Sequence, residues 1–280
     1  MLVLIRKRQV MVADYHIHTT LCKHARGAVP AYHAAARTAG LPELGFADHA
    51  PAPDGYDAAC RMTIAEFPRY QAMVSELPRD PAQPVRFGIE ADYYEGGVPF
   101  LERWLPAQEF DFVLGSIHYI GDWPFDNPDA MDRWESADIQ GVWTAYFELV
   151  AKLVRTGLFD VVGHLDLPKK FGHRLDDRRL VELAKPVMDA VAAAGMAVEL
   201  NSGGLRKPVA EIYPSAPLLA LAREREIPVC FGSDAHRPEE VGAGFDKAVA
   251  LARDAGYTRC ARFEQRSRRL VELPAREVGS

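Results

Sequence analysis

The chain alternates short runs of apolar residues with longer segments of helical periodicity from one end to the other. This order is typical of a parallel sheet or barrel whose strands are joined by crossover helices. Several of the runs are almost entirely apolar, as strands buried on both faces should be. The seven expected strands are Val10–Tyr15, Leu44–Ala47, Val85–Ile89, Phe112–Ser116, Phe159–Val162, Ala197–Leu200 and Val229–Gly232. The sequence therefore predicts an α/β architecture of about seven strand-helix units.

The segments between the strands carry helix start and stop signals. Gly40 and Gly157 stand where a left-handed cap would end two of the helices. Thr63, followed three residues later by Glu66, forms a capping-box signature. The expected helices are Val29–Ala39, Ile64–Leu77, Pro99–Trp104, Ile139–Arg155, Asp177–Ala194, Pro217–Arg225 and Pro238–Ala255. No Pro/Gly/Ser linker or internal repeat interrupts the series, which favours one continuous domain over residues 1–280.

The composition is ordinary for a globular protein, with 48% hydrophobic and 26% charged residues. A formal net charge of −6 offers no broad positive field, which counts against nucleic acid as the main partner. The four cysteines form no Cys-x-x-Cys pair, no apolar run approaches about 18 residues, and Met1–Ile5 is too short for a secretory signal. We expect a cytoplasmic protein without a membrane partner, and the oligomeric state is unknown. The basic stretch Arg259–Arg269 is interpreted as a solvated amphipathic end segment.

Metal-binding residue types follow six of the seven expected strands. His16 and His18 lie two residues apart, so the period of a strand sends both imidazoles to the same face. Histidine and carboxylate side chains bind zinc, iron and manganese, and the carboxyl ends of barrel strands converge on one face. The candidate ligands are His16, His18, His24, His49, Glu90, His118, His164, Asp234 and His236. Nine ligands are too many for one tetrahedral ion, so we expect two or three divalent transition-metal ions, Zn, Fe or Mn.

The candidate ligands gain weight from their repetition, since any one of them alone is more often a polar strand end or a hydrogen-bonded core residue. Glu90 is the expected bridge, because its two oxygens can span ions about 3.5–4 Å apart. Asp48 and Asp166 either orient a ligating imidazole or lie at the surface. Cys22 either replaces His24 as a ligand or, more commonly for such a cysteine, fills apolar space.

A glycine-containing turn after the sixth strand can present backbone amides and an arginine to an anion. Arg206 offers a rigid fork of donors that matches phosphate oxygens. Lys169 and Lys170 on the neighbouring loop either supply further positive charge or are ordinary surface lysines. His173 lies at the mouth of the expected barrel and is a candidate substrate contact. His33 falls inside the first helix and is expected to face solvent.

Read in order, these motifs resemble the polymerase and histidinol phosphatase (PHP) family, in particular its stand-alone histidinol-phosphate phosphatases. The motifs are His16-Ile17-His18-Thr19, Cys22-Lys23-His24, Asp48-His49, Gly88-Ile89-Glu90, Ser116-Ile117-His118, Gly163-His164-Leu165-Asp166, Asn201 to Lys207 and Ser233-Asp234-Ala235-His236. The resemblance runs from about Val10 to Leu273 and implies a distorted (β/α)7 barrel with a trinuclear metal centre. It implies one ion on His16, His18, Glu90 and Asp234, a second on Glu90, His118 and His164, and a third on His24, His49 and His236.

The resemblance also implies an enzyme, a phosphomonoesterase that hydrolyses L-histidinol phosphate to L-histidinol and phosphate in histidine biosynthesis. The implied catalytic residues are Glu90, His118, Arg206 and Asp234, with Arg206, Lys170 and His173 toward the substrate. We expect hydroxide to attack phosphorus in line while metal ions and Arg206 neutralise the other phosphoryl oxygens.

Other functions stay open because fold alone does not define a substrate. One alternative is a PHP phosphoesterase that acts on another small ester or on nucleotides. A second is an amidohydrolase, although the metal-bridging lysine usual in that class is not apparent. A third is a non-catalytic module of a polymerase assembly, which the lack of an attached polymerase region and of a basic track disfavours.

Overall fold

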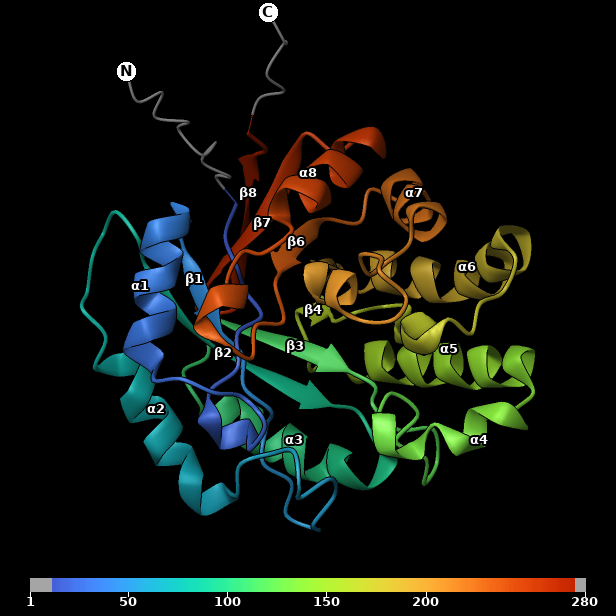
Figure 1. Ribbon diagram of the computed structural model, residues 1–280, viewed down its shortest axis with the longest axis horizontal. Coiled ribbons are helices and arrows are strands. Elements are labelled where there is room, and N and C mark those ends of the chain that lie inside the picture. The colour runs from blue at the N-terminus through green and yellow to red at the C-terminus, as the bar shows by residue number, and fades with distance from the viewer. Residues whose placement is uncertain (1–11, 275–280) are drawn as a thin grey trace, which may run out of the picture.

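The core of the protein is a curled parallel sheet ringed by helices (Figure 1). The computed structural model describes residues 12–274. Six strands pair in chain order, each parallel to the next. They are β1 (Leu44–Phe46), β2 (Val85–Asp92), β3 (Phe112–Ser116), β4 (Val161–Val162), β5 (Ala197–Asn201) and β6 (Val229–Gly232). Parallel neighbours need a crossover, and a helix lies in each of the five connections, which confirms the predicted α/β architecture.

Residues 14–18 close the gap between the two edges of this sheet. On one side, the amide of Gly45 in β1 donates to the carbonyl of Asp14 at 2.6 Å. On the other side, the amide of His18 donates to the carbonyl of Ala235, just after β6, at 3.0 Å. Isolated parallel bridges join the segment to both edges. The segment therefore takes the place of a seventh strand and completes the distorted barrel that the sequence predicted.

Helices cover the outside of the barrel, and their caps follow the sequence. They are α1 (Val29–Ala39), α2 (Phe67–Ser75), α3 (Val98–Trp104), α4 (Asp132–Glu135), α5 (Ile139–Thr156), α6 (Asp177–Ala193), α7 (Ala216–Glu224) and α8 (Phe245–Asp254). Gly40 and Gly157 end α1 and α5 with φ of 70° and 66°, the left-handed conformation that glycine adopts without strain. Among residues 12–274, no helix combines the length and hydropathy that crossing a membrane requires.

A small apolar cluster fills the barrel at the end opposite the carboxyl ends of the strands. The ring of Phe112 lies edge-on to Tyr15 at 5.0 Å, and Tyr15 lies edge-on to Phe263 at 5.4 Å. All three side chains are buried. Gly88 is required beside them, because a Cβ there would come within 2.3 Å of the Phe112 ring. The cluster closes this end of the barrel, which leaves the opposite mouth for a site.

Phe263 belongs to an antiparallel hairpin, β7 (Arg259–Glu264) and β8 (Ser267–Glu272). The interpretation of Arg259–Arg269 as a solvated end segment is therefore wrong for β7, whose Phe263 is 2% exposed, and right for the outer strand β8, most of which is exposed. The alternation of arginines with apolar residues has the period of a strand, and it reflects one face turned to the barrel and one to water.

The structure also differs from the prediction in two helices. The last helix, predicted as Pro238–Ala255, is split into a short 3₁₀ turn and α8, because Gly242 and Gly244 adopt φ of 66° and 79° between them. The short helix α4 was not predicted. Residues 10 and 11 of the first expected strand, Val10–Tyr15, and the apolar run Met1–Ile5 lie outside the described part of the chain. The described remainder of that expected strand is no regular strand and makes only an isolated bridge at Asp14.

Replacing Phe263 by Ala should destabilise the protein by about 3–5 kcal/mol, because it empties a buried ring site beneath the barrel. Chemical denaturation of both proteins measures the change. Arg259→Ala, on the exposed side of the same strand, is the matched control and should change stability by less than about 0.5 kcal/mol. A loss below about 1 kcal/mol for Phe263→Ala would show that the hairpin does not close the barrel.

Candidate metal centre

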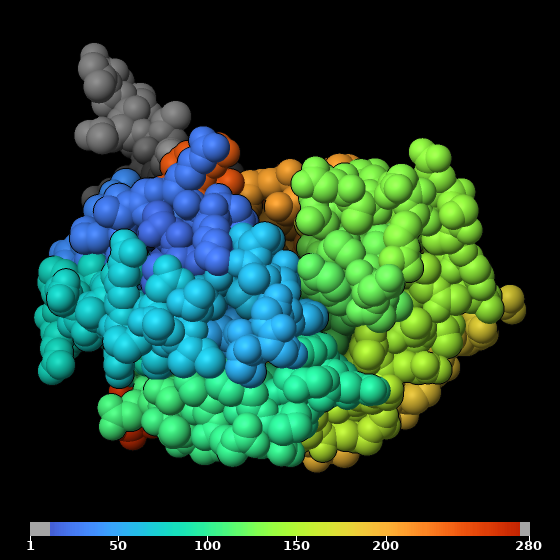
Figure 2. All heavy atoms as spheres, turned by 90° about the horizontal axis from the view of Figure 1, so that it is seen from below, coloured from blue at the N-terminus to red at the C-terminus, as the bar shows by residue number. Residues whose placement is uncertain are grey.

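The carboxyl ends of the strands surround a cavity of about 770 Å³. Figure 2 shows a hollow on this face between the segments coloured blue to cyan and the green segment. Of the nine candidate ligands, eight line the cavity: His18, His24, His49, Glu90, His118, His164, Asp234 and His236. His16, the ninth, is fully buried beneath them. The barrel thus brings together residues that are as much as 220 positions apart in the sequence.

Glu90, in β2, lies at the centre of this group. Its Oε2 is 3.3 Å from His16 Nε2 and 3.0 Å from His49 Nδ1. Its Oε1 is 3.1 Å from His164 Nε2 and 3.6 Å from His118 Nε2, and also accepts a hydrogen bond from Ser116. The two oxygens therefore face different sets of imidazoles, which is the arrangement that a bridging carboxylate needs.

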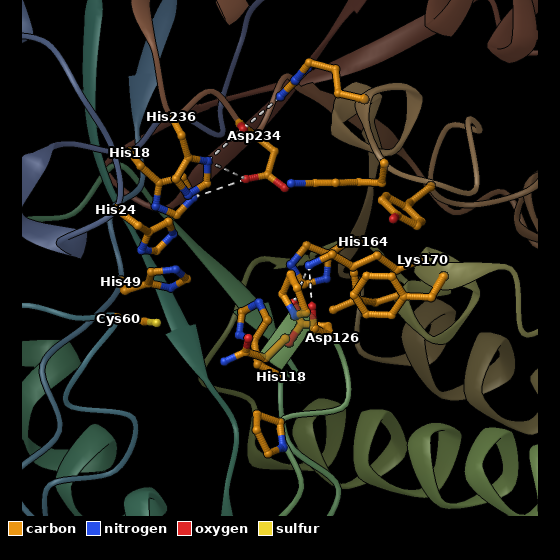
Figure 3. Close-up of a pocket in the computed structure, with 18 of the residues that line it drawn as sticks. His18, His24, His49, Cys60, His118, Asp126, His164, Lys170, Asp234 and His236 are labelled. Carbon is orange, nitrogen blue, oxygen red and sulfur yellow. Dashed lines mark hydrogen bonds and ion pairs between the residues drawn. The ribbon is translucent and has the colours of Figure 1, made fainter. Parts of the chain in front are cut away.

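Donor atoms of the described residues gather into five groups, in each of which they lie within 4.8 Å of one another, and three of these groups consist of candidate ligands alone. These three are His16, His18 and Glu90; Glu90, His118 and His164; and His24, His49 and His236. Asp234 joins the first, with Oδ1 3.4 Å from His18 Nε2. Figure 3 shows His18, His24, His49 and His236 on one side of the cavity, facing His118 and His164 on the other. These three groups fall within the three ligand sets that the family resemblance implies, and the other two groups add Cys22 and Asp92 as possible donors.

The donors suit cations because several of their nitrogen and oxygen atoms are buried and make no hydrogen bond. Among the described buried side chains, the atoms that lack a hydrogen-bond partner include His16 Nε2, His49 Nδ1, Glu90 Oε2 and His236 Nε2. Burial would lower the pKa of His16, but the carboxylates of Glu199, Glu90 and Asp234 raise it well above its usual value. Buried carboxylates need compensating positive charge. A divalent metal ion provides that charge and binds several of these donor atoms at once, whereas a proton binds only one or two.

A second layer of carboxylates orients the ligands. Asp48 is buried beside the ligands and does not lie at the surface: it accepts the amide of His49 at 2.8 Å, and its Oδ1 lies 3.6 Å from His18 Nδ1, beyond hydrogen-bond distance. Asp166 is also buried, but it accepts the amide of Ser215 and pairs with Lys169 at 2.9 Å, away from the ligands. The same pair explains why Lys169 is buried and does not line the cavity.

Glu199 is an orienting residue that the sequence reasoning missed. Its Oε1 lies 2.6 Å from His16 Nδ1, and its Oε2 accepts the amide of His164 at 2.9 Å. The sequence signal was Gly232 on the neighbouring strand, where a Cβ would come within 1.9 Å of Glu199 Oε1. Only glycine leaves room for this carboxylate between two strands.

Asp92, two residues after Glu90, was also missed. Its Oδ2 contacts His118 Nδ1 at 3.0 Å, and it pairs with Arg61 at 3.1 Å. Arg61 is buried and also donates to the carbonyl of Ala50, which fixes the loop after β1 over the cavity. Burial opposes ionisation of Asp92, but His118 and Arg61 lower its pKa well below the usual value. A carboxylate held in this way fixes the ring of His118.

The remaining predicted residues fall in different places. Cys22 is buried, and its Sγ belongs to a possible donor group with His18 and His236, so its two readings as ligand and as filler both stay open. His33 is 5% exposed, so the expectation that it faces solvent is wrong. His173 stacks on Trp134 at 4.2 Å and is not among the residues that line the cavity.

Arg206 and Lys170 both line the cavity. Arg206 donates through Nη2 to the carbonyls of Ser233 and Asp234, at 2.7 and 3.0 Å, which anchors the guanidinium beside the metal ligands. Lys170 donates to Asp126 at 3.0 Å, so part of its charge is already compensated. Arg206 also has a carboxylate neighbour, Glu240, 3.5 Å from its Nε, but its Nη1 makes no hydrogen bond or ion pair with the described residues and is free to meet an anion.

Histidines and carboxylates buried at the mouth of an α/β barrel define a protein that binds divalent metal ions. Residues 14–203 match the PHP domain, and residues 219–248 match the PHP-associated segment. The chain belongs to the PHP family.

Relatives of similar length accompany this match. A probable histidinol-phosphatase of Deinococcus radiodurans is 46% identical over 247 residues, 88% of this chain and 94% of the relative. The histidinol-phosphatase of Bacillus subtilis is 28% identical, over 83% of this chain and 96% of the relative. A histidinol phosphate phosphatase from Lactococcus lactis, whose structure contains zinc, L-histidinol and phosphate, has a TM-score of 0.73 at 18% identity and covers 92% of this chain and 98% of its own. The last likeness shows a common fold.

Glu90→Gln should reduce turnover by about 100-fold or more and lower the metal content, because the amide cannot present two anionic oxygens to two groups of imidazoles. Elemental analysis and phosphate release on the same sample measure both effects. Glu95→Gln, an exposed glutamate five residues away, is the control. Near-normal turnover in a metal-replete Glu90→Gln protein would contradict the bridging role.

Glu199→Gln should weaken metal binding by about 10- to 100-fold although all nine candidate ligands remain, because a neutral amide orients His16 less firmly than a carboxylate does. Metal release into a competing chelator measures the affinity. Glu224→Gln, on the exposed end of α7, controls for the loss of one charge. An unchanged affinity would mean that the position of His16 does not depend on Glu199.

Proposed function

We propose that this protein is a metal-dependent phosphomonoesterase that hydrolyses L-histidinol phosphate to L-histidinol and phosphate, a reaction of histidine biosynthesis. The observation that carries the proposal is the placement of Arg206 in the same cavity as several groups of possible metal-binding donors, two of which share Glu90. The relative from Deinococcus radiodurans supports the choice of substrate, since its identity of 46% extends over 94% of its length.

The reaction explains why so many donors are gathered. Phosphate monoesters hydrolyse extremely slowly in water, with enzymatic accelerations that reach about 10²¹-fold, and the barrier falls when positive charge surrounds the phosphoryl group. Bound divalent ions supply Lewis-acid charge and lower the pKa of water so that a nucleophile is available near neutral pH. Under this proposal, the nine ligands hold two or three such ions, Zn, Fe or Mn, and Glu90, His118 and Asp234 lie nearest the reacting atoms.

Arg206 has the substrate-binding role in this proposal. Its Nη2 is occupied by two carbonyls, which leaves the Nη1 edge of the fork for phosphoryl oxygens. Glu240 lies 3.5 Å from its Nε and limits how far the guanidinium can turn. Lys170 is assigned a weaker part because Asp126 already binds it. The proposal does not retain the contact of His173 with substrate, since Trp134 covers that ring.

A small substrate fits the dimensions and charge of the site. The cavity of about 770 Å³ lies in the range of pockets for small molecules. Its walls include both cations and the carboxylates of Asp57, Asp126 and Glu240, which suits a compact molecule with a phosphate and an amino group better than a polyanion. We further propose that residues 1–280 act as one domain and that the protein works in the cytoplasm without a nucleic-acid or membrane partner.

Phosphate release across a panel of phosphomonoesters tests the function. Metal-replete protein should hydrolyse histidinol phosphate with a kcat/KM at least about 10-fold above those of p-nitrophenyl phosphate and of nucleoside monophosphates, and chelation should abolish the activity until divalent ions are restored. Amide substrates run in parallel should be inert. Preference for a nucleotide or an amide over histidinol phosphate would replace the proposal with one of the alternatives.

A further inference from the structure

Tyr213 has a buried hydroxyl group without a partner in the wall of the cavity. The side chain is 1% exposed and lines the cavity. Six of the described cavity-lining residues have a buried polar atom without a hydrogen-bond partner: His18, His49, Glu90, His164, Tyr213 and His236. Five of them belong to the proposed ligand set. Tyr213 is the sixth, and its hydroxyl group lacks a hydrogen-bond partner. A metal ion bound by the other five would not provide that partner, whereas a bound molecule with an acceptor oxygen would.

The backbone and neighbours of Tyr213 hold the ring firmly. Its amide and carbonyl exchange hydrogen bonds of 2.9 and 2.7 Å with Asn201, at the end of β5. A Cβ on Gly204 would come within 2.7 Å of the ring, so the turn that carries Arg206 packs directly against it. The ring also lies edge-on to that of His164. A side chain fixed in this way is preorganised, since little rotational freedom is left to lose when a ligand binds.

The hydroxyl stays protonated in these surroundings, so its hydrogen is available to donate. Burial raises the pKa of Tyr213 far above its usual value, and the charges of Asp166, Asp234 and Asp126 raise it further. Lys169 is 5.2 Å from the ring centre but is bound to Asp166, so its charge is compensated. Tyr119, another tyrosine of the cavity wall, differs because its hydroxyl already donates to Asp57 at 3.0 Å.

We propose that the Tyr213 hydroxyl donates a hydrogen bond to a non-bridging oxygen of the substrate phosphoryl group, which Arg206 in the same cavity wall also contacts. The inference rests on the proposed phosphatase function. A phosphoryl dianion presents only acceptors, so it satisfies a lone donor without introducing a new unpaired group. The position is also suited to inorganic phosphate, the product, because the contact does not involve the alcohol part of the ester.

Tyr213→Phe removes the donor alone and provides the test. Metal-replete variant should lose about 10- to 100-fold in kcat/KM, by the same factor on p-nitrophenyl phosphate and on histidinol phosphate, and should bind inorganic phosphate correspondingly more weakly by calorimetry. Metal content should match that of the wild type. Unchanged kcat/KM on both esters would overturn the proposal, and so would a loss confined to histidinol phosphate, which would place the hydroxyl on the leaving group.

Tyr257→Phe is the matched control. Its hydroxyl is buried and donates to the carbonyl of Ile227 at 2.9 Å, and the residue does not line the cavity. Loss of this satisfied bond should lower Tm and leave turnover unchanged, whereas Tyr213→Phe should lower turnover and leave Tm unchanged, because it breaks no bond of the protein. If the wild type binds phosphate but hydrolyses neither ester, the proposed function fails, and weaker phosphate binding by Tyr213→Phe still supports the contact.

Discussion

The structure depends on the burial of one carboxylate, Glu90, among five imidazoles from four different segments of the chain. An isolated ionised group in such a position would cost many kcal/mol, so the barrel has to bring compensating charge to it. Burial favours the neutral form of Glu90, but His16 and His49 lower its pKa well below the usual value. Glu90 and the imidazoles around it can be buried only together, and the carboxyl ends of the barrel strands are where side chains from different segments meet.

Closure of the barrel is what makes that convergence possible, and it depends on two segments that are weak as isolated elements. Residues 14–18 form no regular strand, yet they hydrogen-bond to both edges of the sheet and deliver His16 and His18. The hairpin of β7 and β8 fills the opposite end with Phe263. One end of the barrel interior is thus filled by apolar side chains, and the other end holds the charged candidate ligands. Different residues therefore stabilise the barrel and form its site.

Much of this arrangement could be predicted from sequence because it follows from local periodicity. The strands and most helix ends were visible in apolar runs and in glycines such as Gly40, and the ligands followed the strands directly. Glu199 was missed, since its contact with His16, 183 residues away, and the need for Gly232 beside it both follow from how the strands pair. Tyr213 and the hairpin were missed for the same reason: their neighbours are set by tertiary packing, whereas the candidate ligands are each marked by their own position.

Contacts with backbone carbonyls also decide which nitrogen His24 and His236 offer. His24 Nδ1 lies 2.7 Å from the carbonyl of Cys22, and His236 Nδ1 lies 3.0 Å from that of Asp234. A carbonyl only accepts, so both Nδ1 atoms must carry the proton, and each Nε2 is left with a free lone pair for a cation. His49 is the exception, because its Nδ1 faces Glu90 at 3.0 Å. Tautomers fixed before a metal ion arrives reduce the reorganisation that binding requires, which favours a centre built on strand ends over one built on mobile loops.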